Sequence, residues 1–341
     1  MTNGLSGPRK QFLDVLRVLA TCAVVLMHVL TGATDVTDAS IVPEYRSLLL
    51  SVMDLVTWCV PIFLLISGYL FLNPERTLTY PVMIKKYCRR IALAILLFGV
   101  PYAASELVVA ERTFRIRMIP EALKMTLMGH TWSHMWYLYL ILFLYLITPL
   151  LKKVLRVLPV WGVAAVMAVI FLGSSVAPFL NKVLDVNSIP VLPDGGVYFL
   201  YYLCGYLFAV REVGVDKGRN VWLTAAVAVL ALGMILSRTL AGFSIQMAYN
   251  YPFTVLLAVL LFAAGWNGSI QKHRIPWQEA GALSFAVYLV HPVYVNLLYK
   301  FVKITPFTVL EQCGVQSVAA GQAVLILLLA AFCLVVLALA T

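Results

Sequence analysis

One apolar stretch near the N-terminus, residues 14–29 (DVLRVLATCAVVLMHV), carries Asp14, Arg17 and His28. Arg17 and His28 are about three helical turns apart, so in a helix they share one face, and Thr21 lies on the same stripe. Asp14 precedes Arg17 by three positions and is expected to pair with it. A histidine is suited to acid–base chemistry, because its ordinary pKa near 6.5 lets it take up and release a proton near neutral pH. His28 is therefore the candidate catalytic residue.

Each of these residues also has a structural interpretation. The long side chain of Arg17 can reach the cytoplasmic interface, with Asp14 as its surface partner. His28 lies deeper, where ionisable groups are costly and usually face a cavity, so a functional role is favoured over that of a hydrogen-bonded structural histidine. Two routes stay open for His28: it acts as a general base, or it acts as a nucleophile that carries the transferred group itself.

The composition indicates that membrane helices position these residues. The chain has 341 residues, of which 62% are hydrophobic and 12% are charged, a balance that excludes a soluble domain of this length. A bilayer core about 30 Å thick needs about 20 apolar residues per helix. We therefore expect an all-α polytopic membrane protein that forms a single domain over residues 1–341, with about ten transmembrane helices around a polar central cavity. The predicted spans are residues 11–33, 45–72, 85–106, 134–151, 159–180, 195–211, 220–237, 246–266, 280–301 and 316–340.

The net charge of +10 does not predict a nucleic-acid partner, because the basic residues lie in short loops between apolar runs. Lys and Arg are more frequent in one set of alternate loops, which predicts that both termini face the cytoplasm. The first span has no cleavage site and is expected to be retained. The last span runs to the end of the sequence, and a further tail is left open. The more basic set is Arg9, Lys10, Arg76, Lys85, Lys86, Arg89, Arg90, Lys152, Lys153, Arg156, Arg211, Lys217, Arg219, Lys272 and Arg274.

Five motifs in order along the chain resemble those of the acyltransferase family 3 integral membrane proteins. The first is the arginine, ten residues and histidine of RVLATCAVVLMH (17–28). The others are VPIFLLISGYLF (60–71), KKYCRRIALAI (85–95), HMWYLYLILFLYLITPLL (134–151) and LSFAVYLVHPVY (283–294). The resemblance implies transfer of an acyl group, most often acetyl, from cytoplasmic acetyl-CoA or another acyl-CoA. The acceptor that it implies is a hydroxyl of an extracytoplasmic or lipid-linked glycan.

Several residues are candidates for binding the donor. Basic side chains at the start of the third span can bind the phosphates of acyl-CoA, although basic residues at helix ends are also ordinary topology signals. Arg17 can bind phosphate or the pantetheine amides, and a pantetheine arm would then follow the polar stripe toward His28. Pro61 is expected to break the second span and free a backbone carbonyl. The candidate donor-binding residues are Arg17, Ser67, Tyr69, Lys86, Arg89 and Arg90.

A second intramembrane histidine, His291, precedes Pro292, which is expected to loosen its helix. His291 and Tyr288 are candidates for orienting His28 or the acceptor, with Asp14 as a further supporting residue. Between the third and fourth spans, apolar residues at helical spacing indicate a helix on the outer surface. The aromatic residues that follow either form an interfacial belt or stack on a sugar ring. The acceptor-side candidates are Glu106, Trp132, His134 and Trp136; no metal site is expected, since His130 and His134 lack a third ligand.

Two other classes of function stay open. A transporter of a small polar solute such as serine, or of a lipid-linked sugar, also needs buried polar groups among many spans, although no internal repeat is visible. A membrane module for sensing or scaffolding is the third possibility. The expected partners are membrane lipids and a glycan or other hydroxyl acceptor, and the oligomeric state is left open.

Overall fold

The computed structural model describes residues 11–37, 42–210, 217–240, 248–267 and 276–341, and within these ranges the protein is helical without β-strands. The all-α fold expected from the composition is therefore confirmed. The chain divides into two compact units: unit 1 comprises residues 1–68 and 166–341, and unit 2 comprises residues 69–165. The single domain predicted for residues 1–341 stays a prediction, because two compact units can belong to one domain.

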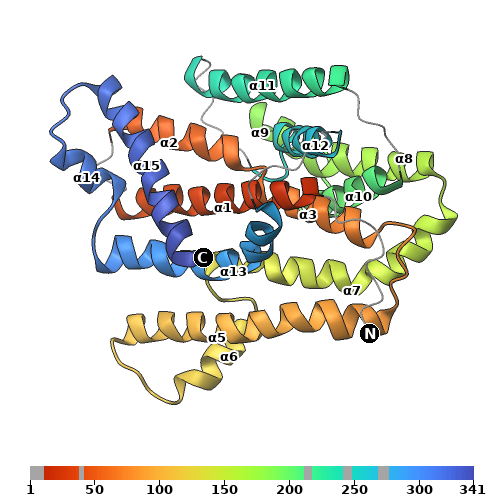
Figure 1. Ribbon diagram of the computed structural model, residues 1–341, viewed down its shortest axis with the longest axis horizontal. Helices are drawn as coiled ribbons and strands as arrows, with labels where there is room; N and C mark the ends of the chain where they lie inside the picture. Colours follow the sequence, from red (N-terminus) through yellow and green to blue (C-terminus); the bar gives the residue numbers. More distant parts are fainter. Residues whose placement is uncertain (1–10, 38–41, 211–216, 241–247, 268–275) are drawn as a thin grey trace. The chain divides into compact units, whose positions relative to one another are not determined.

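Unit 1 contains most of the membrane helices, beginning with the helix that carries His28. Its elements are α1 (Gln11–Thr37), α2 (Pro43–Val56), α3 (Cys59–Phe71, whose last turn belongs to unit 2), η3 (Leu172–Val176), α9 (Ala177–Val183), α10 (Gly196–Val210), α11 (Lys217–Leu240), α12 (Pro252–Asn267), α13 (Trp277–Asn296), η4 (Leu297–Phe301), α14 (Pro306–Gln312) and α15 (Val318–Ala340) (Figure 1). Helix α8 (Val160–Phe171) crosses the boundary between the two units.

Unit 2 is built around two long helices, α5 (Arg89–Glu111) and α7 (Trp136–Val157). Its shorter elements are α4 (Tyr80–Val82), η1 (Met83–Cys88), α6 (Met118–Leu127) and η2 (Ser133–Met135). Helix α7 extends beyond the predicted span 134–151. The prediction of orientation placed Lys152, Lys153 and Arg156 in a loop, whereas in the structure they lie in the last turns of α7.

Seven described segments are long and apolar enough to cross a membrane: Gln11–Asp35, Pro43–Phe71, Tyr80–Glu111, Ser133–Val157, Val160–Val183, Trp277–Phe301 and Val318–Ala340. Three shorter apolar helices, Gly196–Val210, Val221–Met234 and Pro252–Trp266, lie at the other three predicted spans. The count of ten spans stays a prediction. Of the loop cations used to predict the orientation, Arg9, Lys10, Arg211, Lys272 and Arg274 lie outside the described residues.

The predicted break in the second span is confirmed. Helix α2 ends at Val56 and α3 begins at Cys59, one residue before the apolar motif 60–71 and two residues before Pro61. Pro61 has no backbone N–H, so the carbonyl of Thr57, four residues earlier, cannot receive its usual helical hydrogen bond. In α13, by contrast, the helix continues through Pro292 to Asn296 and is followed by the π-helical turn η4. The loosening expected at Pro292 therefore does not end the helix.

Helices α1 and α13 lie side by side and run in the same direction (Figure 1). Gly32 faces the later part of α13, where an added Cβ would come within 3.1 Å of Val295 Cγ1. Tyr299 in η4 donates a hydrogen bond of 3.1 Å to the carbonyl oxygen of Val29. The core of unit 1 surrounds this pair with apolar side chains from α1, α2, α13, α14 and α15. The pair is thus fixed both by packing and by a buried hydrogen bond.

The segment predicted to lie on the outer surface forms the amphipathic helix α6. Its residues Met118, Ala122 and Thr126 are buried, and α6 packs against α5. The opposite face leaves Ile119, Leu123 and Leu127 exposed, as expected for a helix lying in a lipid interface. The helix and its apolar face are confirmed, whereas its location on the outer membrane surface stays a prediction.

Candidate functional site

The structure brings together the two histidines of the predicted membrane spans. The rings of His28 on α1 and His291 on α13 lie with centroids 4.9 Å apart and planes inclined by 37°. His291 is fully buried, whereas His28 is partly exposed. The sequence predicted a supporting role for His291, and the two residues are now adjacent although they lie near opposite ends of the chain.

A hydrogen bond assigns the tautomer of neutral His291. Its Nδ1 lies 3.0 Å from the carbonyl oxygen of Val287, one helical turn earlier. A carbonyl only accepts hydrogen bonds, so Nδ1 carries the proton and Nε2 carries the lone pair. Tyr288, the other residue predicted to support His28, has its ring centroid 6.3 Å from that of His291. The rings of His28 and Tyr288 therefore both lie near the ring of His291.

The other end of the same helix pair carries the predicted ion pair. Arg17 Nη1 donates a hydrogen bond of 2.9 Å to Asp14 Oδ1, and Asp14 is almost completely buried. Gly281 of α13 lies against Asp14, because a Cβ added there would be 3.1 Å from Asp14 Cβ. Along the axis of α1 the distance from Asp14 to His28 is about 21 Å. The α1–α13 seam, the interface between these two helices, thus contains the cation Arg17 and, further along α1, the pair of imidazoles.

The predicted donor-binding residues fall in both units. In unit 2, Lys86, Arg89 and Arg90 are exposed around the junction of η1 and α5, and Lys86 Nζ lies 5.5 Å from the ring centroid of Tyr87. Ser67 and Tyr69 are both buried within α3. The exposed cations of unit 2 are thus accessible to an anionic ligand, and the two hydroxyl residues are packed inside the protein. Their roles, like that of Arg17, stay predictions.

Part of the predicted acceptor side assembles around a residue that the sequence did not single out. Trp132 stacks on Tyr102 of α5 with ring centroids 4.2 Å apart and planes inclined by only 4°. The ring of His134 lies 5.6 Å from that of Tyr102 and 6.3 Å from that of Trp132. Glu106 is exposed on the next turn of α5. Tyr102 follows Pro101 within an apolar run, so nothing in its local sequence indicated this stack.

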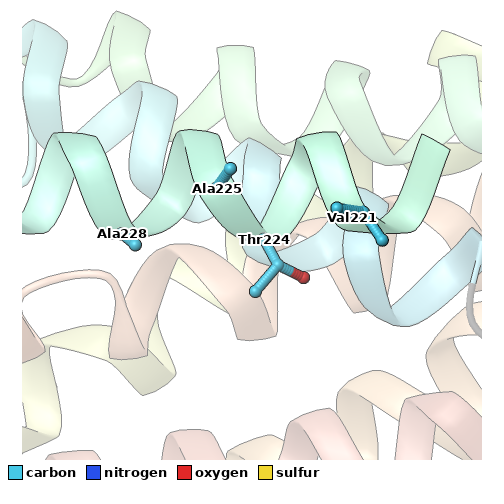
Figure 2. Close-up of a pocket in the computed structure, with 4 residues that line it drawn as sticks. All are labelled: Val221, Thr224, Ala225 and Ala228. Atoms are coloured by element: carbon cyan, nitrogen blue, oxygen red, sulfur yellow. The ribbon is translucent and has the colours of Figure 1, made fainter. Parts of the chain in front are cut away.

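Trp136, the remaining acceptor-side candidate, begins α7 and is partly exposed, with its ring 6.3 Å from that of Tyr137. Figure 2 shows a different feature, an open apolar pocket of about 470 Å³ on α11, lined by Val221, Thr224, Ala225 and Ala228. None of the predicted site residues lines this pocket, and its lining offers no group for acid–base chemistry. The predicted polar central cavity therefore stays a prediction.

Comparisons with known proteins give one result that bears on the whole chain. The family model for acyltransferase family 3, described as "Acyltransferase domain", matches residues 10–341. No curated protein and no solved structure matches the chain. Together with its apolar helices, the match defines a multi-pass membrane protein of an acyltransferase class. The chain belongs to acyltransferase family 3, as its five motifs indicated.

Proposed function

We propose that this protein is a membrane-bound O-acyltransferase. It transfers an acyl group, here proposed to be acetyl, from cytoplasmic acyl-CoA to a hydroxyl of an extracytoplasmic or lipid-linked glycan. The observation that carries the proposal is the contact between His28 and His291 in a chain of the acyltransferase family. A pair of imidazoles in a membrane protein is costly unless it has a function.

In the proposed reaction His28 serves as the general base. The acceptor hydroxyl gives its proton to a ring nitrogen of His28 while its oxygen attacks the thioester carbonyl carbon. Collapse of the tetrahedral intermediate breaks the carbon–sulfur bond, and the coenzyme A thiolate takes the proton back from His28. In the covalent alternative, His28 attacks the thioester first and then passes the acyl group to the hydroxyl. Both routes leave an ester and coenzyme A.

His291 is proposed to orient His28. Its Nδ1–H is held by the Val287 carbonyl, which leaves Nε2 as a hydrogen-bond acceptor. His28 is partly exposed whereas His291 is buried. This difference supports His28 as the reacting base and His291 as the orienting residue, because substrate must reach the reacting imidazole. Tyr288 adds a hydroxyl near the same ring.

The two substrates are proposed to approach from opposite sides of a bacterial inner membrane, with both termini of the chain in the cytoplasm. Arg17 of unit 1 is proposed to bind a phosphate of the donor, and the pantetheine arm is proposed to follow the interface of α1 and α13, along which Asp14 and His28 are about 21 Å apart. In unit 2, Arg89 and Arg90 stay candidate phosphate ligands. Within unit 2, the stack of Trp132 on Tyr102 is proposed as a binding surface for a sugar ring, since aromatic faces suit such a ring.

The test uses purified protein in nanodiscs with [14C]acetyl-CoA and the glycolipid fraction of the native membrane. We expect label to enter the glycolipid fraction and the rate to fall by about 100-fold or more in His28→Ala, the usual contribution of a general base. His130→Ala removes an exposed histidine and is the matched control, with a rate equal to that of the unchanged protein. Uptake of [14C]serine into proteoliposomes without any acyl transfer would contradict the proposal and favour the transporter.

A further inference from the structure

Unit 2 contains a buried lysine that the proposed reaction does not use. Lys152 of α7 is only 6% exposed, whereas the adjacent Lys153 is exposed. Lys152 Nζ donates a hydrogen bond to the carbonyl oxygen of Asn73, in the turn that follows α3. An ammonium group has three donors, and among the described residues this carbonyl is the one acceptor it meets. Two donor positions of a buried cation are thus left for another partner.

A second cation lies in the same turn. Arg76 Nη1 donates a hydrogen bond of 2.8 Å to the Leu70 carbonyl, and Nη2 lies 3.3 Å from the hydroxyl of Tyr87. The guanidinium is also 5.5 Å from the ring centroid of Phe71. A guanidinium has five N–H donors, of which these contacts use two. The side chain is therefore held in place with most of its donors still available.

The charge around these two residues is uncompensated. Within the described part of the chain neither Lys152 nor Arg76 forms an ion pair with a carboxylate, and the neighbouring Glu75 is exposed. Arg76 and Arg156 instead both repel the ammonium of Lys152. Burial of an unpaired charge is unfavourable unless a counter-ion is supplied. An anionic ligand would supply it.

We propose that Lys152, Arg76 and Tyr87 form a binding site for a phosphate ester. An ammonium, a planar guanidinium and a phenol together offer the donors that phosphate oxygens accept, and Arg in particular binds phosphate through two parallel hydrogen bonds. Exposed cations continue the positive surface at the start of α5, where Lys86 lies over the ring of Tyr87. The assignment of this phosphate to the acyl-CoA donor rests on the proposed function; the phosphate of an anionic lipid is the other source.

The test measures binding separately from catalysis. The probe for the donor is 3′,5′-ADP, the nucleotide end of coenzyme A, titrated into the full chain in nanodiscs of neutral phosphatidylcholine. Loss of one charge-assisted hydrogen bond in Lys152→Gln or Arg76→Gln is expected to weaken binding by about 10- to 100-fold. Lys153→Gln removes the exposed neighbour and is expected to bind as the unchanged protein does. Lys152→Arg keeps the charge and is expected to restore most of the affinity.

The second arm measures retention of phosphatidylglycerol by native mass spectrometry of the same variants. Weaker 3′,5′-ADP binding with unchanged lipid retention supports the site, with the acyl-CoA donor as its ligand. Unchanged 3′,5′-ADP binding with weaker phosphatidylglycerol retention supports the site, with a lipid as its ligand. Unchanged binding of both probes in Lys152→Gln and Arg76→Gln, with each variant monodisperse, would overturn the proposal. Neither binding measurement needs acyl transfer. If the proposed reaction is wrong, acyl transfer would be absent while binding of 3′,5′-ADP or lipid is still measured.

Discussion

At the scale of single residues, the contact between His28 and His291 is the basis of the proposed chemistry. The Val287 carbonyl accepts a hydrogen bond from Nδ1 of His291, and the ring of His291 lies 4.9 Å from that of His28. In the proposed reaction His28 acts on substrate, and His291 acts through His28. The two roles predict different kinetic consequences of substitution.

His291→Gln is expected to lower kcat for acetyl transfer by about 10-fold while leaving the KM for acetyl-CoA unchanged, because a residue that orients the base affects the transition state more than binding. Steady-state release of coenzyme A measures both constants. A rise in KM with unchanged kcat would indicate that His291 contacts the donor and does not position His28.

Some residue contacts could be predicted from the sequence and others could not. The ion pair between Asp14 and Arg17 follows from their spacing of three positions in a helix. Lys152 and Lys153 are equivalent in the sequence, and only the packing of α7 buries one of them and exposes the other. The phosphate-binding site proposed for Lys152 therefore could not be distinguished from an ordinary basic helix end.

At the scale of secondary-structure elements, the α1–α13 pair is the frame of the candidate site. Gly281 lets the two backbones approach where α13 passes Asp14, since an added Cβ there would meet Asp14 at 3.1 Å. The histidines lie further along the same seam, so a change in the spacing of the helices would also change the contact between the rings.

Gly281→Val is accordingly expected to lower acetyl transfer by at least about 10-fold, because overpacking of a helix interface displaces the backbone. Ala282→Val is the matched control, since Ala282 is the next residue and is exposed. The measurement is the initial rate of coenzyme A release at equal amounts of folded protein. Equal rates for the two variants would show that this part of the seam does not position the histidines.

The helices themselves were predictable, because long apolar runs in a membrane protein have few other conformations. The break between α2 and α3 was also predictable from the missing N–H of Pro61. The pairing of α1 with α13 was not, because both helices are apolar on most faces and no local pattern in either sequence specifies its neighbour. The resemblance of the motifs to a family pointed to both histidines but not to their contact.

At the scale of the whole molecule, the proposed approach of the two substrates from opposite sides depends on the orientation of the chain in the membrane. The predicted orientation places the segment between η4 and α15 outside, because α13 would run outward from the cytoplasm. Cys313 lies in this segment and is exposed, whereas the cysteines at positions 59, 88, 204 and 333 are buried. The accessibility of the Cys313 thiol from each side of the membrane therefore reports the orientation of the chain.

A membrane-impermeant maleimide added to intact spheroplasts is expected to label Cys313, with at least about five times less label in Cys313→Ser; buried thiols react slowly because reagent cannot reach them. Thr77→Cys in the Cys313→Ser background places a thiol at an exposed position in the predicted cytoplasmic turn and is expected to react after lysis only. Labelling of Cys313 exclusively in inside-out vesicles would reverse the orientation.

The central claim is that the donor reaches the imidazole of His28. The most direct measurement replaces His28 with cysteine in a chain whose six native cysteines are serine or alanine, and follows its modification by a methanethiosulfonate reagent. The account predicts that the thiol reacts and that coenzyme A slows the reaction several-fold. A thiol that stays unmodified in the folded protein, with or without coenzyme A, would place position 28 in sealed hydrocarbon and contradict the account.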